Sequence, residues 1–212
     1  MLFRMDSLKE LIMRLPIIIF ALTVHEVSHG YAALKMGDPT AKNLGRLTLN
    51  PLKHLDLFGF LAMLIAPIGW AKPVPIIPRN FKNYKKGIML VSLAGPLSNL
   101  LLAILMALLY YQGFSRINMP VALAYNLWLF CETFIILNIG LGVFNLLPIP
   151  PLDGSKIFLG YLPHKVQEFL TRNQTNSLIV LLVIIYFLSG TLNFLTYSVY
   201  SGLKWLIMLI PF

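Results

Sequence analysis

Residues 15–34 of the chain, LPIIIFALTVHEVSHGYAAL, form an apolar run that also carries two histidines and a glutamate. An α-helix needs about 20 mainly apolar residues to cross the hydrocarbon core of a bilayer, so this run is long enough to span a membrane. Ionisable side chains inside a span are costly unless they are paired or hydrated, and they usually mark a functional site. The run therefore predicts a membrane helix that carries a functional site in its second half.

The composition of the whole chain also indicates a membrane protein. Of its 212 residues, 58% are apolar and 12% are charged, whereas globular proteins average about half apolar and a quarter charged. The length allows about four to six spans with their loops, but no large soluble domain in addition. We therefore predict a single membrane-embedded domain over residues 1–212, with its core at about 11–160 and a C-terminal helix or hairpin at about 177–210.

The formal net charge of +9 raises the question of a nucleic-acid partner. The basic residues lie in short segments between apolar runs, where they face anionic lipid headgroups and set the topology. The expected partner is therefore the lipid bilayer, and no nucleic acid is expected. The single cysteine, Cys131, lies inside an apolar run, so an intrachain disulfide is excluded.

Further apolar runs follow the first, at residues 57–70, 87–111, 121–147 and 177–210. The run 57–70 is too short to span and contains Pro67, a combination typical of re-entrant or interfacial segments. The run 177–210 allows either one tilted helix or a hairpin of two.

Residues 39–50, PTAKNLGRLTLN, predict a short strand or hairpin, because Leu47 and Leu49 alternate weakly with polar residues between turn formers. The predicted fold class is an all-α polytopic membrane protein. It is a bundle of about 4–6 transmembrane helices with a re-entrant segment and a small strand or hairpin element.

The order of ionisable residues in HEVSHG, residues 25–30, is typical of a zinc hydrolase. His25 and His29 are spaced i, i+4, so both imidazoles lie on one face of a helix and can bind a single ion. Glu26 occupies the position of the general base in the pattern H-E-x-x-H, which takes a proton from water and does not bind the metal. The alternatives are a metal-ion or proton transporter that uses the same ligands, and a catalytically silent scaffold.

A catalytic zinc site needs a third protein ligand, and FNLLPIPPLDG, residues 144–154, offers Asp153. Three prolines break the preceding helix, so we expect an extended segment that leads to Asp153, with Gly154 permitting a turn. The alternative is that Asp153 caps a helix starting near Ser155. Asn145 could donate a hydrogen bond to a carbonyl oxygen that becomes negative during hydrolysis.

Together these motifs resemble the site-2 protease family, intramembrane zinc metalloproteases that cut transmembrane or membrane-proximal segments. The resemblance rests on HEVSHG and NLLPIPPLDG, with GWAKPVP at 69–75 and AGPLSN at 94–99 similar to compact bacterial members. It implies one catalytic Zn²⁺ and membrane-protein substrates, and no segment resembles a PDZ or regulatory domain. The residue roles that it implies are zinc ligation by His25, His29 and Asp153, base catalysis by Glu26 and oxyanion stabilisation by Asn145.

Other polar residues have simpler interpretations. In AGPLSN we expect Gly95 to allow close helix packing and Asn99 to hydrogen-bond a neighbour. Asn138 is expected to make an interhelical hydrogen bond, and Glu132 lies mid-span without an obvious partner. His54 and its neighbour Asp56 are expected at solvated loop positions.

The topology follows from the shared ion. The ligands lie in the C-terminal half of the first span and just beyond the C-terminal end of the span at 121–147. They must share one depth, so these helices should run in the same direction, with 57–70 entering and leaving by one face. Segments 35–56, 71–86 and 148–176 carry 4, 5 and 3 basic residues, whereas 112–120 carries one. The positive-inside rule then places zinc near the cytoplasmic face, in what we expect to be a bacterial cytoplasmic membrane. An extended substrate could pair with a strand edge near residues 44–49.

Overall fold

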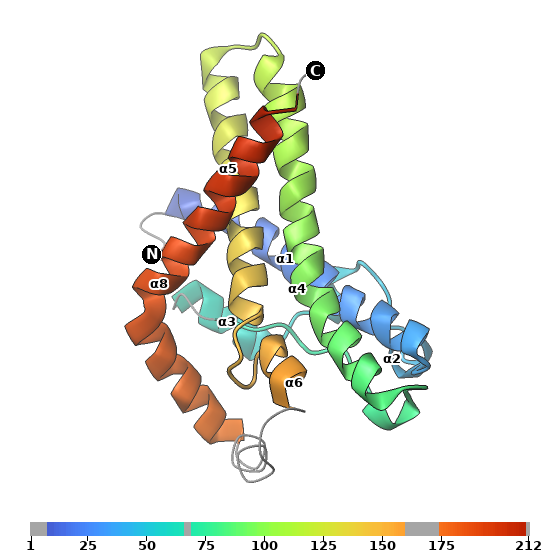
Figure 1. Cartoon of the computed structure of the whole chain (residues 1–212). Coiled ribbons are helices and arrows are strands. Elements are labelled where there is room, and N and C mark those ends of the chain that lie inside the picture. Colours follow the sequence, from blue (N-terminus) through green and yellow to red (C-terminus); the bar gives the residue numbers. More distant parts are fainter. Residues whose placement is uncertain (1–7, 66–68, 160–173, 211–212) are drawn as a thin grey trace.

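The structure is a computed structural model that describes residues 8–65, 69–159 and 174–210, and it is mostly helical (Figure 1). The helices are α1 (Leu8–Met36), α2 (Thr40–Asn43), α3 (Leu57–Ile65), α4 (Tyr84–Leu108), α5 (Val121–Asn145), α6 (Asp153–Leu159) and α8 (Gln174–Met208). Short turns of other helix types lie between them, at η1 (Pro51–Lys53), η2 (Pro78–Asn80), η3 (Leu109–Gly113) and η4 (Phe114–Arg116).

Among the described residues, three helical stretches are long and apolar enough to cross a membrane: Lys9–Met36, Tyr84–Arg116 and Val121–Asn145. Each covers all or nearly all of one long apolar run of the sequence, and the protein is an integral membrane protein. The C-terminal run, which allowed one helix or a hairpin, belongs to the single helix α8.

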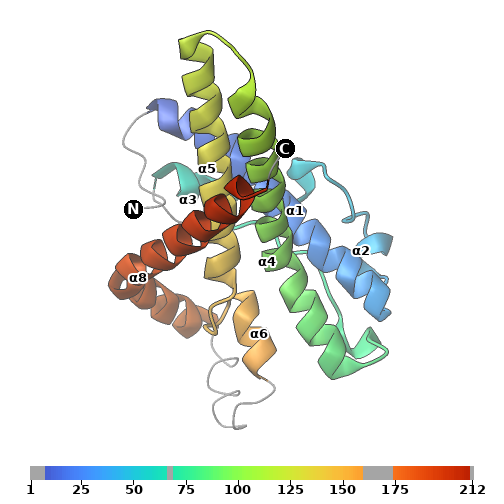
Figure 2. The same cartoon turned by 45° about the horizontal axis from the view of Figure 1, so that its top comes forward.

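Helix α4 packs against both α1 and α5, and α8 packs against α5 (Figure 1). In Figure 2, α1 and α5 both descend along the chain and α4 rises. This is the relative direction that a site shared by the second half of α1 and the chain after α5 requires. Ile17 and Ile18 of α1 pack on Phe134 and Leu137 of α5. A second apolar cluster joins α4, α5 and α8 through Ala103, Ala107, Ile135, Ile139 and Ile207.

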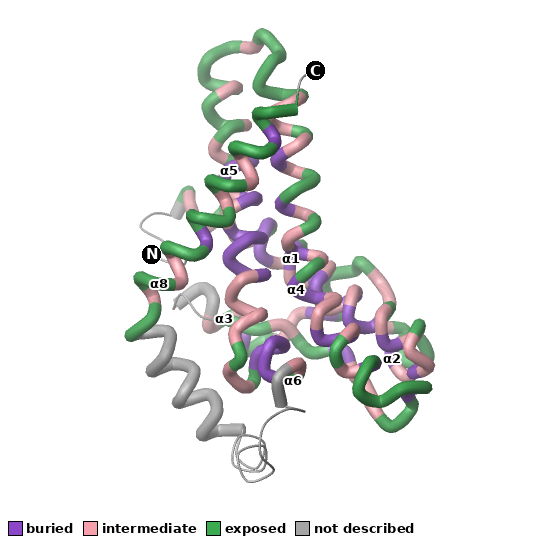
Figure 3. Tube along the Cα trace, viewed as in Figure 1, coloured by how far each residue is buried: buried purple, intermediate pink, exposed green. Residues whose placement is uncertain are grey.

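Burial is concentrated where α1, α4, α5 and α6 meet, whereas the hairpin between α4 and α5 is largely exposed (Figure 3). The exposed side chains in this hairpin include large apolar ones such as Leu109, Val121 and Leu123. For a membrane protein, apolar exposure of this kind is expected on faces that contact lipid.

The prediction of a strand or hairpin at residues 39–50 is wrong. Thr40–Asn43 form α2, Gly45 adopts a left-handed φ of +62°, and the N–H of Arg46 donates back to the carbonyl of Ala41 at 2.9 Å. These backbone groups are therefore bonded locally and not to another strand. The side chain of Leu47 packs against Gly30 of α1, so closely that a Cβ added at Gly30 would lie 2.5 Å from Cδ2 of Leu47. Its apolar side chain reflects packing on α1 and not a sheet face, and the docking edge expected at 44–49 is absent.

The chain just before α3 and the chain that follows it at Ala71 lie side by side. Leu55 and Ala71 form an isolated antiparallel bridge, and the N–H of Lys72 donates to the carbonyl of His54 at 2.7 Å. Beyond this bridge, in the part of the chain that the structure describes, no β-structure is present. At about 1.5 Å per residue, the nine residues of α3 are too short to cross a hydrocarbon core of about 30 Å.

The residues that flank this bridge differ from expectation. His54 is not solvated, since it is only 2% exposed and its Nε2 lies 2.9 Å from the carbonyl oxygen of Thr48. Asp56 is half-buried and accepts a hydrogen bond from the N–H of Gly59 at the start of α3. Both side chains make hydrogen bonds to backbone groups only a few residues away, a role that spacing in the sequence did not reveal.

Candidate metal centre

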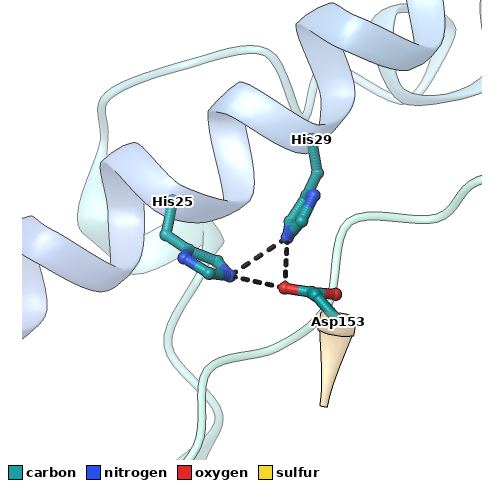
Figure 4. Close-up of side chains that lie close together, drawn as sticks. All are labelled: His25, His29 and Asp153. Carbon is teal, nitrogen blue, oxygen red and sulfur yellow. Dashed lines mark hydrogen bonds and ion pairs between the residues drawn. The ribbon is translucent and has the colours of Figure 1, made fainter. Parts of the chain in front are cut away.

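The two histidines of the H-E-x-x-H pattern project from one face of α1 (Figure 4). His25 and His29 are one helical turn apart, and both are buried, with 4% and 6% of their surface exposed. Their Nε2 atoms are 3.0 Å apart. The helical spacing therefore brings both imidazoles to one point, as the sequence pattern indicated.

Asp153 reaches the same point from the first residue of α6, 128 residues further along the chain than His25. Its Oδ2 lies 3.0 Å from Nε2 of His25 and 2.9 Å from Nε2 of His29 (Figure 4). The other carboxylate oxygen, Oδ1, accepts a hydrogen bond from the ammonium of Lys156 at 2.8 Å. One carboxylate oxygen thus faces the histidines while the other is held by a cation on the same helix.

The segment between α5 and α6 is a series of turns and not the extended chain that its prolines suggested. The N–H groups of Leu147, Ile149 and Leu152 donate to carbonyls only two or three residues earlier. Gly154 lies within α6 and has no left-handed φ, so it does not serve the turn expected of it. It is needed because a Cβ there would lie 2.2 Å from the carbonyl oxygen of Leu146.

Gly95 of α4 forms the opposite side of the centre. A Cβ built at Gly95 would lie 2.4 Å from Nε2 of His29 and 2.6 Å from Nε2 of His25. Such distances are well below van der Waals contact, so only glycine allows α4 to approach the two imidazoles this closely. The close helix packing expected of Gly95 occurs against the histidines themselves.

The outer ring nitrogens determine where each imidazole carries its proton. Nδ1 of His29 lies 2.7 Å from the carbonyl oxygen of Val91, which can only accept, so Nδ1 is the donor. Nδ1 of His25 lies 2.7 Å from Oδ1 of Asn99. With the protons on Nδ1, both neutral imidazoles present an Nε2 lone pair to each other and to Asp153.

These three groups fit a metal ion. The ligand atoms of His25, His29 and Asp153 all lie within 4.8 Å of one another, and all three residues are buried. Two lone pairs and a carboxylate oxygen repel one another at such distances unless a metal cation or a proton lies between them. Two imidazole nitrogens and one carboxylate oxygen are the donor set of hydrolytic zinc sites, in which a fourth position stays open for water.

Glu26 and Asn145 do not belong to this cluster. The Oε2 atom of Glu26 accepts the N–H of Val74 at 2.8 Å, so the segment GWAKPVP holds this carboxylate. The amide nitrogen of Asn145 donates to the carbonyl of Leu141 at 3.0 Å, within its own helix. Both residues are half-buried: Glu26 follows His25 directly on α1, and Asn145 is the last residue of α5.

Asn138 and Glu132, two buried polar residues of α5, both have partners. Asn138 makes the expected interhelical hydrogen bond, since its Oδ1 accepts from Nδ2 of Asn99 at 3.1 Å. The carboxylate of Glu132, for which the sequence suggested no partner, accepts hydrogen bonds from the hydroxyls of Tyr111 and Tyr200. Sequence reasoning missed the contact of Asn99 with His25, because the two residues are 74 positions apart and AGPLSN indicated only helix packing.

Comparisons with known proteins identify one class. The family model described as "Peptidase family M50" matches residues 113–189. "Putative zinc metalloprotease YwhC" of Bacillus subtilis is 44% identical over 171 residues, which cover 79% of this chain and 77% of that protein. "Putative zinc metalloprotease Rip2" of Mycobacterium tuberculosis H37Rv is 32% identical over 178 residues, 82% of this chain and 65% of that protein.

A more distant relative, "Zinc metalloprotease MJ0392" of Methanocaldococcus jannaschii, is 29% identical over 145 residues, 68% of this chain and 33% of that protein. No solved structure gives a significant match to the chain. Helices that can cross a membrane, a buried His–His–Asp cluster and these relatives define an integral membrane zinc metalloendopeptidase. The chain belongs to peptidase family M50, the site-2 protease family.

Proposed function

We propose that this protein is an intramembrane protease that hydrolyses peptide bonds in or near transmembrane segments of membrane-protein substrates. The observation that carries the proposal is the convergence of His25, His29 and Asp153 within the apolar part of the fold. In this proposal these three residues hold one Zn²⁺. When bound, zinc would supply a Lewis acid that lowers the pKa of water, so that hydroxide is available for attack at neutral pH, and that polarises the peptide carbonyl.

In this mechanism Glu26 is the general base that takes a proton from the attacking water. The N–H of Val74 is bonded to Oε2, which fixes the carboxylate and leaves Oε1 to receive the proton. Glu26 can later give this proton to the amine that leaves. A carboxylate held by one backbone hydrogen bond is oriented for this exchange without being consumed by a salt bridge.

Asn145 is proposed to donate its amide N–H to the substrate oxygen as that oxygen becomes negative. Its N–H now bonds the carbonyl of Leu141 at 3.0 Å, so the side chain must rotate away when substrate binds. The carbonyl of Leu141 lies within a helix and loses only an additional bond. Once negative charge develops, the substrate oxygen is a stronger acceptor for the amide N–H of Asn145 than the neutral carbonyl of Leu141.

We further propose that the protein lies in a bacterial cytoplasmic membrane, with the zinc site nearer the cytoplasmic face. The basic segments 35–56 and 71–86 would then lie in the cytoplasm together with α6. The bridge between Leu55 and Ala71 supports this arrangement, because a segment whose ends meet can enter and leave the bilayer by one face.

The decisive experiment compares zinc content and cleavage of a synthetic transmembrane peptide by the purified wild type and the Glu26→Gln variant. Glu26→Gln should retain zinc and lose cleavage, whereas His29→Ala and Asp153→Ala should lose zinc as well. Glu10→Gln, at a half-buried position in the first turn of the same helix where Glu10 pairs with Arg14, is the matched control and should cleave normally. Cleavage by Glu26→Gln at a rate near that of the wild type would rule out the proposed mechanism.

A further inference from the structure

A continuous line of side-chain amides joins His25 to α5 through α4. Oδ1 of Asn99 faces Nδ1 of His25 at 2.7 Å, and Nδ2 of Asn99 donates to Oδ1 of Asn138 at 3.1 Å. Nδ2 of Asn138 donates in turn to the carbonyl of Phe134 at 2.9 Å. Both asparagines are fully buried, with 0% of their surface exposed, so water offers no alternative partner.

We propose that Asn99 is a positioning residue that fixes His25 in the tautomer needed for zinc, and that Asn138 holds Asn99 in the required orientation. This inference rests on the proposed zinc site. Neither asparagine contacts the reacting atoms. Their effect on catalysis is exerted through the orientation and proton position of His25.

The direction of every hydrogen bond in this line is set by backbone carbonyls, which can only accept. Nδ2 of Asn99 lies 3.2 Å from the carbonyl of Ala21, and Nδ2 of Asn138 lies near that of Phe134. Each amide is therefore oriented with its oxygen toward the next donor. Since Oδ1 of Asn99 is an acceptor, His25 must carry its proton on Nδ1, which leaves the Nε2 lone pair for the metal.

The two histidines differ in how they are held. His29 donates to the backbone carbonyl of Val91, which no side-chain substitution removes. His25 depends on the side chain of Asn99, and through it on a third helix. Substitution of the asparagines should therefore weaken one ligand only, and zinc affinity should fall without disappearing.

A purely structural role would predict something else. Asn99 and Asn138 also tie α4 to α5, so their removal could lower stability without any specific effect on zinc. The two roles separate when zinc affinity and the stability of the zinc-free protein are measured on the same variants. Affinity is obtained from competition with a chromophoric chelator, and the ligand environment from the visible spectrum of the Co²⁺-substituted protein.

Asn99→Leu, which keeps the branched shape of the side chain and removes the acceptor, should weaken zinc binding about 10- to 100-fold. Asn138→Leu should give a smaller loss in the same direction. Asn99→Asp retains an acceptor for His25 and should bind zinc more tightly than Asn99→Leu, which supplies a readout if the leucine variant folds poorly. Thr23→Val is the matched control, because it removes a buried hydroxyl of α1 that bonds only its own helix, to Ile19.

The inference is supported if zinc affinity falls in the order wild type, Asn99→Asp, Asn99→Leu, while Thr23→Val binds like the wild type and the Co²⁺ spectrum of Asn99→Leu changes. Two results would overturn the inference and leave the proposed site standing, provided that His25→Ala loses zinc. One is a wild-type zinc affinity in Asn99→Leu, and the other is a zinc affinity in Asn99→Asp that is no higher than in Asn99→Leu. Retention of zinc by His25→Ala would overturn the site, and the inference with it.

Discussion

Gly95 of α4 and His25 of α1 are so close that a methyl group on Gly95 would lie 2.6 Å from Nε2 of the imidazole. The same methyl would lie 2.4 Å from Nε2 of His29. One side of the metal centre is therefore formed by backbone alone. Space for an ion between the imidazoles depends on the absence of a side chain at this one position.

Gly95→Ala should consequently remove zinc and destabilise the packing of α4 on α1. Overpacking of a buried site typically costs about 1–3 kcal/mol. Zinc content and the thermal unfolding midpoint of the purified protein measure the two effects. Gly202→Ala is the control, because a Cβ at Gly202 meets nothing within 4 Å. A Gly95→Ala protein with full zinc occupancy would contradict the geometry described for the centre.

Gly154→Ala should displace Asp153, because the added Cβ would lie 2.2 Å from the backbone oxygen of Leu146. Backbone cannot rotate away as a flexible side chain can, so α6 must shift. We expect lower zinc affinity with α1 and α4 intact. Chelator competition measures the affinity, and helical content by circular dichroism should stay at the wild-type level. Unchanged zinc affinity would show that α6 can move without moving Asp153.

Asn145→Ala should lower kcat by about 10²- to 10³-fold while zinc occupancy stays close to that of the wild type. The reason is that the amide of Asn145 bonds only its own helix in the absence of substrate, so its removal leaves the metal cluster in place. Turnover of a transmembrane peptide and zinc content are measured together. Loss of zinc in this variant would instead make Asn145 a support of the α5–α6 turn.

Asp38 provides a pH-dependent contribution to stability outside the membrane spans. Burial alone would raise the pKa of its carboxyl, but the N–H of Ile77 and the side chains of Thr40 and Asn80 hydrogen-bond to it and hold the pKa below its ordinary value of 3.8. Because the folded-state pKa is the lower one, the carboxylate stabilises the fold fully above the ordinary value. This contribution is lost as the pH falls through 3.8 toward the folded-state pKa.

Asp38→Asn should therefore cost about 2 kcal/mol at neutral pH, and its deficit relative to the wild type should shrink below about pH 4. Thermal unfolding between neutral and acid pH measures the difference. Thr40→Val, which removes one donor to the same carboxylate, should show a smaller deficit with the same trend. A deficit that stays constant down to pH 3 would mean that the charge of Asp38 does not contribute.

The proposed orientation can be tested with single cysteines at Lys42 and Lys82, in a Cys131→Ser background. Both lysines are exposed and lie in the basic segments that flank the bridge of Leu55 and Ala71. A membrane-impermeant thiol reagent should label neither in intact cells and both in opened cells. Arg116→Cys, on the opposite side, should be labelled in intact cells. Labelling of only one lysine position in intact cells would mean that the segment between them crosses the bilayer.

Local patterns in the sequence predicted much of the fold and of the candidate centre. Helical periodicity places His25 and His29 on one face whatever the tertiary structure, and three of the long apolar runs lie in helices that can cross a membrane. The runs could not show how far each helix continues, because polar turns at both ends of α1 and at the start of α4 extend the helices beyond the apolar residues.

The failures concern residues whose state is set by distant contacts. Leu47 packs on α1, so its alternation with Leu49 did not indicate a strand. His54 is buried by chain that returns at Ala71 and Lys72, which spacing within LKHLDL cannot reveal. The contact of Asn99 with His25 likewise requires α4 to lie against α1, and a glycine at position 95 to let it do so.

The bridge between Leu55 and Ala71 joins the chain just before α3 to the chain that leads to Val74. This junction is made by backbone hydrogen bonding, as in the bond from the N–H of Lys72 to the carbonyl of His54, so it does not depend on the side chains of α3. Val74, whose N–H bonds the carboxylate of Glu26, follows the bridge in the sequence. Substitutions on the exposed side of α3 should therefore alter what the protein presents to the bilayer while the carboxylate of Glu26 keeps its place.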